Sequence, residues 1–123
     1  MRASFLAQIE ASWPCAATAK LEGWPVGYPV ALGAAAAGHL VPLADTLRAY
    51  AIAFVSNLAS AAIRLSVIGQ TDGQRVIAAL LPALDEAATR CLSATLDDLG
   101  AAAFRSDLAS LLHETQHTRL FRS

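Results

Sequence analysis

The chain has 123 residues, enough for one folded domain, and its 9 basic and 10 acidic side chains leave a net charge of −1. This balance excludes the basic surface that binding to nucleic acid requires. The hydrophobic fraction of 55% is high and the charged fraction of 15% is low. The 28 alanines explain part of this excess. The remainder predicts an apolar face for another subunit or for another part of the same protein.

Two further features bound the class of protein. Cys15 and Cys91 are isolated and are expected to be buried free thiols in a reducing compartment. No membrane span is expected, because prolines interrupt the uncharged residues 23–44. The helical segment between Arg48 and Arg64 is shorter than the ~20 residues that a span needs.

Helical spacing recurs along the chain, and no strand pattern accompanies it. A first helix is expected over Arg2–Ser12, ending before a proline. A connector over residues 15–28 leads to a short helix with Pro29 at its first position and Gly38 as its C-terminal cap.

The long helix that follows is expected from near Pro42 to Ile68, with two apolar faces that predict a central position. One face consists of Leu47, Tyr50, Phe54, Leu58, Ala61 and Leu65, and the other of Ile52, Val55, Ala59 and Ile63.

Two more helices complete the expected fold. Thr71 and Gln74 fit a capping box that begins a helix ending near Leu96. Ser106 and Asp107 are expected to cap a last helix that begins at about Leu108. The predicted fold class is therefore all-α, a compact array of about five helices forming one domain over residues 1–123.

A possible metal motif lies near the C-terminus. His113-Glu-Thr-Gln-His117 matches H-E-x-x-H, in which two histidines bind zinc and the glutamate acts as a base. The remaining histidine, His39, lies upstream, so no downstream ligand completes the set. A small zinc hydrolase is one alternative, and a solvated C-terminal helix is the simpler interpretation.

The long helix also carries a polar stripe. Asn57, Ser60 and Arg64 are spaced i, i+3 and i+7, so they share one face. An arginine among so many apolar residues needs an acceptor, because an unpaired buried charge is costly. A structural network and a hydrogen-bonding patch for a partner both remain open.

The chain ends in alternating basic and apolar residues. Leu120 and Phe121 suit anchors in a partner groove, and Arg119 and Arg122 suit contacts with carboxylates. The alternative is that these residues pack on their own domain.

Three segments in order carry a family resemblance: Ser56–Leu65, Gly69–Arg75 and His113–Ser123. Together they resemble the C-terminal half of the urease accessory protein UreF family, and Gly27–Gly33 is similar to the segment before it. Members of that family have an additional N-terminal helical half, which this chain is expected to lack. His117 stands where the family commonly has an aromatic residue, so the resemblance makes the zinc motif a coincidence.

The resemblance implies an all-α, non-catalytic, cytoplasmic chaperone that has no cofactor or metal of its own and forms a homodimer. Such a protein bridges the accessory protein UreD (also called UreH) and the GTPase UreG on apo-urease for nickel delivery. Neither nucleic acid nor a membrane is expected among its binding partners. A non-functional remnant of a truncated gene is the other alternative. The implied partner-binding residues are Glu114, Arg119, Leu120, Phe121 and Arg122 in the tail 113–123, with Asn57, Ser60 and Arg64 on the long helix.

Overall fold

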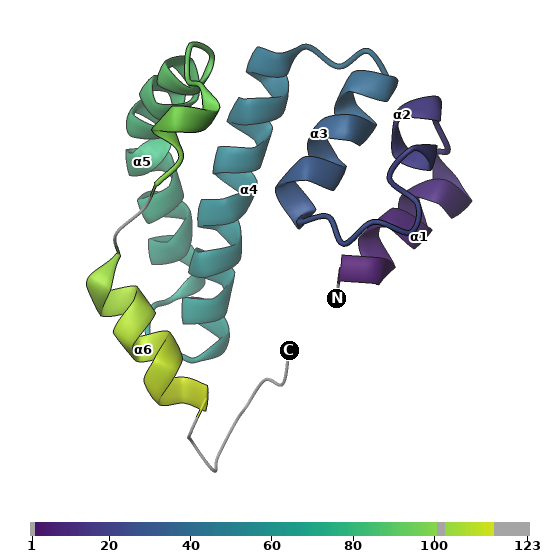
Figure 1. Ribbon diagram of the computed structural model, residues 1–123. Coiled ribbons are helices and arrows are strands. Elements are labelled where there is room, and N and C mark those ends of the chain that lie inside the picture. Colours follow the sequence, from purple (N-terminus) through teal and green to yellow (C-terminus); the bar gives the residue numbers. More distant parts are fainter. Residues whose placement is uncertain (1, 101–102, 115–123) are drawn as a thin grey trace. The chain divides into compact units, whose positions relative to one another are not determined.

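The computed structural model describes residues 2–100 and 103–114, and these contain six α-helices, a short 3-10 helix and no strand (Figure 1). The predicted all-α class is therefore confirmed. The chain divides into two units, one over residues 2–93 and one from Ala94 onward. The first unit holds helices α1 to α5, and the second holds η1 and α6.

The N-terminal part of the first unit consists of α1 (Arg2–Ser12), α2 (Ala16–Ala19) and α3 (Tyr28–Gly38). The first of these has the predicted bounds, whereas α2 lies inside the expected connector. Thr18 is buried in α2, and its hydroxyl donates a 3.0 Å hydrogen bond to the Cys15 carbonyl oxygen. The Thr18 side chain also lies 3.3 Å from Cys15 Sγ, and this contact lowers the pKa of the thiol. These local bonds explain how so short a helix holds its shape.

The remainder of the first unit is the helix pair α4 (Leu43–Arg64) and α5 (Gln70–Cys91). Figure 1 shows α4 between α3 and α5, as its two apolar faces predicted. Arg48 Nε, near the start of α4, lies 2.5 Å from Asp85 Oδ1, near the end of α5, as an antiparallel pair requires. Gly73 is buried in α5, where an added Cβ would lie 2.6 Å from Ile63 Cδ1.

Two helix ends use the same turn. Leu40 and Ser66 follow α3 and α4 with φ angles of 60° and 58°. The next residues, Val41 and Val67, donate to the Ala36 and Ala62 carbonyls at 2.9 Å each. This is the Schellman motif, which usually has glycine at the left-handed position. The helix over 43–64 therefore ends before the predicted Ile68, and Gly38 is the last helical residue of α3 rather than its cap.

The capping box expected at Thr71 is wrong, because Gly69 is the N-cap and Thr71 lies inside α5. That helix ends at Cys91, earlier than Leu96. The box occurs instead at η1 (Leu96–Asp98), where the Thr95 amide donates to Asp98 Oδ2 at 2.7 Å.

The last helix, α6 (Phe104–Glu114), begins before the expected Leu108. Ser106 and Asp107 consequently lie in its first turn rather than ahead of it. A carboxylate in the first turn is favourable because of the partial positive charge at a helix N-terminus.

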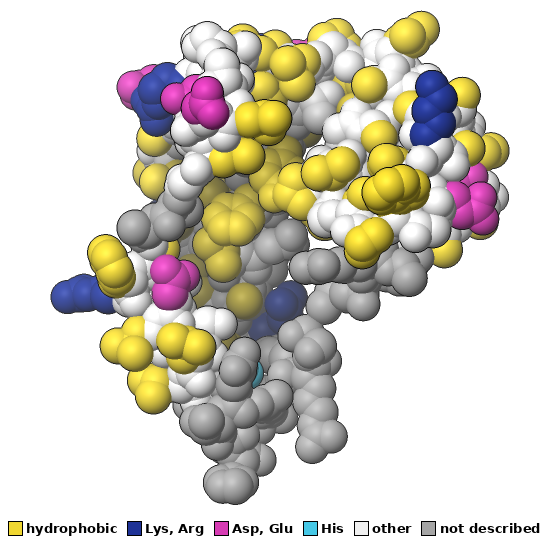
Figure 2. Space-filling model, viewed as in Figure 1, with side chains coloured by type: hydrophobic (Ala, Val, Ile, Leu, Met, Phe, Trp, Pro, Cys, Tyr) yellow, Lys and Arg dark blue, Asp and Glu magenta, His cyan; other side chains and the backbone are white. Residues whose placement is uncertain are grey.

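The buried hydrophobic core of the described residues is small and consists of Ala31, Ala35, Ala59 and Ala88. Large apolar side chains that the sequence assigns to the interior are exposed, among them Phe54 at 57% and Leu58 at 58%. Figure 2 shows apolar side chains spread over much of the viewed face. The helices are present, but most of their apolar surface has no cover within the described residues.

The predicted burial of both cysteines is also wrong, since Cys15 is half-buried and Cys91 is exposed.

By length and composition, α4 could cross a membrane, because the helix that forms is longer than the segment between Arg48 and Arg64. Core helices of globular proteins meet the same criterion, so it is weak evidence. Asp45, Arg48 and Asp85 are exposed on this helix pair, and charged side chains are costly in lipid. The expectation of no membrane span therefore stays an expectation.

Two glycines of α3 should respond oppositely to alanine. A Cβ on Gly38 would overlap Cys15 Sγ and lie 3.1 Å from Cys15 Cβ and 3.3 Å from Ala17 Cβ. A Cβ on Gly33 would meet nothing within 4 Å. We expect Gly38→Ala to lower the free energy of unfolding and Gly33→Ala to raise it by up to about 1 kcal/mol. Urea unfolding followed by circular dichroism measures both, and equal stabilisation would show that α2 does not pack on α3 in this way.

Leu40 occupies a left-handed conformation that costs a non-glycine residue about 1–2 kcal/mol. Because its side chain is 90% exposed, little packing offsets that cost. We expect Leu40→Gly to stabilise the chain by about 0.5–1 kcal/mol in thermal unfolding. Leu43→Gly, which removes an exposed leucine from the first turn of α4, is the control and should destabilise.

Candidate functional site

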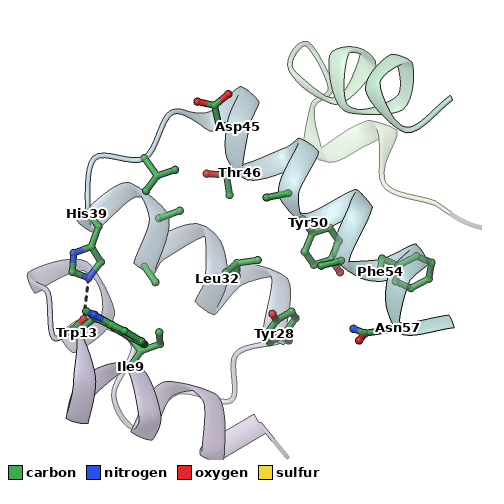
Figure 3. A pocket seen from close by; sticks show the side chains of 15 residues that line it. Ile9, Trp13, Tyr28, Leu32, His39, Asp45, Thr46, Tyr50, Phe54 and Asn57 are labelled. Carbon is green, nitrogen blue, oxygen red and sulfur yellow. Dashed lines mark hydrogen bonds between the residues drawn. The ribbon is translucent and has the colours of Figure 1, made fainter. Parts of the chain in front are cut away.

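An apolar groove of about 680 Å3 lies between α3 and α4, and residues at the end of α1 also line it (Figure 3). We call it the α3–α4 groove. It is lined by Ile9, Trp13, Tyr28, Leu32, Ala35, Ala36, His39, Val41, Asp45, Thr46, Ala49, Tyr50, Ala53, Phe54 and Asn57. Each wall is one stripe of a helix, because the lining residues of α3 and of α4 recur at spacings of three and four.

Aromatic side chains and small ones both line the α3–α4 groove. Tyr28 on α3 and Tyr50 on α4 approach across it with ring centroids 6.3 Å apart. Phe54 follows one turn later on α4 (Figure 3). Ala49 and Ala53 leave the backbone of α4 accessible from the groove. The surface therefore suits a partner that brings an apolar helix close to the backbone.

A hydrogen bond holds the end of α3 to the end of α1. His39 Nε2 donates to the Trp13 carbonyl oxygen at 2.9 Å (Figure 3). Because the carbonyl can only accept, the bond places a proton on Nε2. His39 thus has a local structural role at the rim of the groove.

A second groove, of about 830 Å3, lies against α1 and the loop before α3. Glu10 and Glu22 line it together with Trp24. Glu10 Oε1 is buried there and has no hydrogen-bond partner among the residues that the structure describes. A buried acceptor without a donor is costly, so this carboxylate is a notable feature of the first unit.

The predicted polar stripe does lie on one side of α4, and that side faces the α3–α4 groove. Asn57 lines the groove, and by helical register Ser60 and Arg64 continue the same stripe toward the C-terminal end of the helix. Asn57 and Ser60 make no side-chain hydrogen bond within residues 2–100 and 103–114. Arg64 does interact with another group, so it is not free. The stripe is therefore not a closed network of these three side chains.

The predicted tail falls largely outside the described residues. Glu114 is the last residue of α6, and its side chain, Arg119, Leu120, Phe121, Arg122 and also His117 lie beyond what the structure describes. The helix leading to them is amphipathic, with Phe104, Leu108, Leu111 and Leu112 exposed at spacings of three and four.

The described residues bring together no group of three His, Cys, Asp or Glu side chains that would hold a metal ion. Charged groups instead form exposed ion pairs that support the helices. Glu86 Oε1 and Arg90 Nη1 lie 2.6 Å apart, at the i, i+4 spacing that favours such pairs on a helix. The pair between Arg48 and Asp85 was not predicted, because nothing in the sequence indicates which helices are adjacent.

Sequence reasoning identified Tyr50 and Phe54 as part of an apolar face but assigned that face to the interior. It assigned no surface role to Tyr28 or Trp13. The available signal was the excess of apolar over charged residues, which predicts an uncovered face without locating it.

The missing hydrogen bonds of Asn57 and Ser60 lead to a test of the two interpretations of the polar stripe. We expect Asn57→Ala and Ser60→Ala each to change the free energy of unfolding by less than about 0.5 kcal/mol, as for surface positions. Urea titration measures this. A loss of about 1–3 kcal/mol, the cost of leaving a buried partner unsatisfied, would restore the structural-network interpretation.

Comparison with known proteins gives a consistent result. The family model named UreF matches residues 1–81. A urease accessory protein UreF from Xanthobacter autotrophicus is 55% identical over 124 residues, covering 98% of this chain and 51% of the relative. A protein of the same name from Bradyrhizobium diazoefficiens is 65% identical over 99 residues, covering 80% of this chain and 41% of that relative.

These matches also bound what the chain represents. It spans about half the length of the curated relatives that it matches. No solved structure matches it. The match of the family model to more than half of the chain, together with identities of this size, confirms the resemblance noted in the sequence: the chain belongs to the UreF family.

Proposed function

We propose that this chain acts in urease maturation as a non-catalytic accessory protein. The observation that carries the proposal is the 55% identity over 98% of the chain to a relative named urease accessory protein UreF. The uncovered apolar surface supports it, because a protein that works by binding others needs such surface.

In finer terms, we propose an adaptor that bridges UreD (or UreH) and the GTPase UreG on apo-urease, for nickel delivery. The adaptor would form a homodimer, hold no cofactor or metal of its own, and work in the cytoplasm. The free thiols of Cys15 and Cys91 suit a reducing compartment. The GTPase would carry all nucleotide chemistry.

Within this proposal the C-terminal tail is a contact with the accessory partner. Arg119 and Arg122 flank Leu120 and Phe121, an arrangement that suits an apolar pocket with acidic residues at its rim. Glu114 at the end of α6 would add a carboxylate to the same contact. On α4, Asn57, Ser60 and Arg64 would offer a second, polar contact.

Co-purification of the tagged chain with UreD (or UreH) and UreG, followed by size-exclusion chromatography, tests the adaptor role. We expect a discrete complex that contains both partners. Failure of the folded chain to bind either partner, also when the other half of the relative from Xanthobacter autotrophicus is supplied, would contradict the proposal.

The role of the tail has a control of matched composition, because Phe-Arg occurs twice in the chain. We expect Phe121→Ala with Arg122→Ala to weaken binding to the accessory partner by about tenfold or more, the loss of one anchor residue. Phe104→Ala with Arg105→Ala removes the same side chains from the first turn of α6 and should change the affinity much less. Equal losses in the two double variants, measured by calorimetry, would remove the specific role of the tail.

A further inference from the structure

We propose that the α3–α4 groove is the binding site of an apolar helix from the half of the UreF chain that lies outside these 123 residues. The proposal rests on family membership and on the groove, not on the accessory function. Its failure would therefore leave the adaptor role untouched.

The groove is long enough to hold a helix. Along α4 it extends from Asp45 to Asn57, about 18 Å at ~1.5 Å per residue. A helix of about three turns has that length. The opposite wall is a stripe of α3 that runs from Tyr28 to the C-cap residue His39.

The lining predicts the chemistry of the occupant. Alanines at 49 and 53 let a helix backbone approach closely, and Tyr28, Tyr50 and Phe54 provide apolar walls. The side chains of Tyr28 and Phe54 are 50% and 57% exposed, so they still have surface to bury. An occupant with an apolar stripe fits this lining, whereas a charged segment would lose its hydration without gaining a partner.

One end of the occupant should be polar. Beyond Phe54 the stripe on α4 continues with Asn57 and Ser60, whose side chains have no hydrogen-bond partner in the described part of the chain. A buried amide or hydroxyl must be satisfied. The helix in the groove is therefore expected to place polar side chains over these two residues and apolar ones over Tyr50 and Ala53.

The source of the occupant follows from the length of the relatives. This chain covers 51% of a relative with which it shares 55% identity, so about as much family sequence lies outside it as within it. A helix on the same chain has a high effective concentration at the groove, whereas a second copy must lose translational and rotational freedom to bind. The remaining half is thus favoured over self-association.

The experiment co-expresses this full chain, tagged, with the part of the Xanthobacter autotrophicus relative that the chain does not match. We expect the two to co-purify as a one-to-one complex. Ala53→Glu puts a charge into the lining of the groove and should weaken the complex by about tenfold or more. Ala79→Glu is the matched control, because it places the same charge at an exposed alanine inside the other long helix, away from the groove, and should have little effect.

A second readout reports on the groove itself. Trp13 lines it and is 65% exposed, and Trp24 is the other tryptophan of the chain. With fluorotryptophan incorporated only into this chain, and Trp24→Phe used to assign the two signals, the fluorine resonance of Trp13 should shift on complex formation. The shift should be absent when Ala53→Glu is mixed with the same fragment.

Three outcomes would overturn the proposal. One is equal binding of Ala53→Glu and Ala79→Glu, with both variants helical by circular dichroism. Another is recovery of the folded chain without the co-expressed half. The last is a homodimer that covers Trp13 and that the other half does not displace, which would make a second copy the occupant.

Discussion

The size of the side chains at the helix contacts governs the rest of this structure. Where α4 meets α5 and where α3 meets its neighbours, the buried residues are alanines, a glycine and Thr18, all small enough to allow helix axes to come close. Small side chains bury little apolar area, and apolar area provides most of the stabilisation of a fold. The contacts between these helices therefore bury little apolar area, and larger residues such as Phe54 and Leu58 remain at the surface.

The groove and the polar stripe lie on the same side of α4. The face toward α5 carries Ala59, with Val55 and Ile63 beside it, and the groove lies along another face of the helix. That face carries an aromatic part and then Asn57 and Ser60. A partner on α4 would meet an apolar surface first and hydrogen-bonding groups at its end, an arrangement that fixes register as well as affinity.

The positions of most helices were predictable from the local sequence pattern, but the exposure of their large apolar side chains was not. The bounds of α1 and the position of α4 follow from apolar spacing and proline, which act within a few residues. The ends of α3 and α4 could not be predicted in this way, because Leu40 and Ser66 take a left-handed conformation that non-glycine residues disfavour. An apolar stripe predicts that a face is covered but not whether the same chain covers it, and so Tyr50 and Phe54 were assigned to a core. The tail residues from 115 onward lie outside the described residues, so the contacts expected of them stay predictions.

The contact between Gly38 and Cys15 has a consequence for how this family can vary. The space that a side chain at 38 would need is already occupied by Cys15 and Ala17, which belong to a different helical segment. Substitutions at 15 and 38 are therefore not independent. A relative with a larger residue at the position of Gly38 must have a rearranged turn before α2, so the two positions should vary together among related sequences.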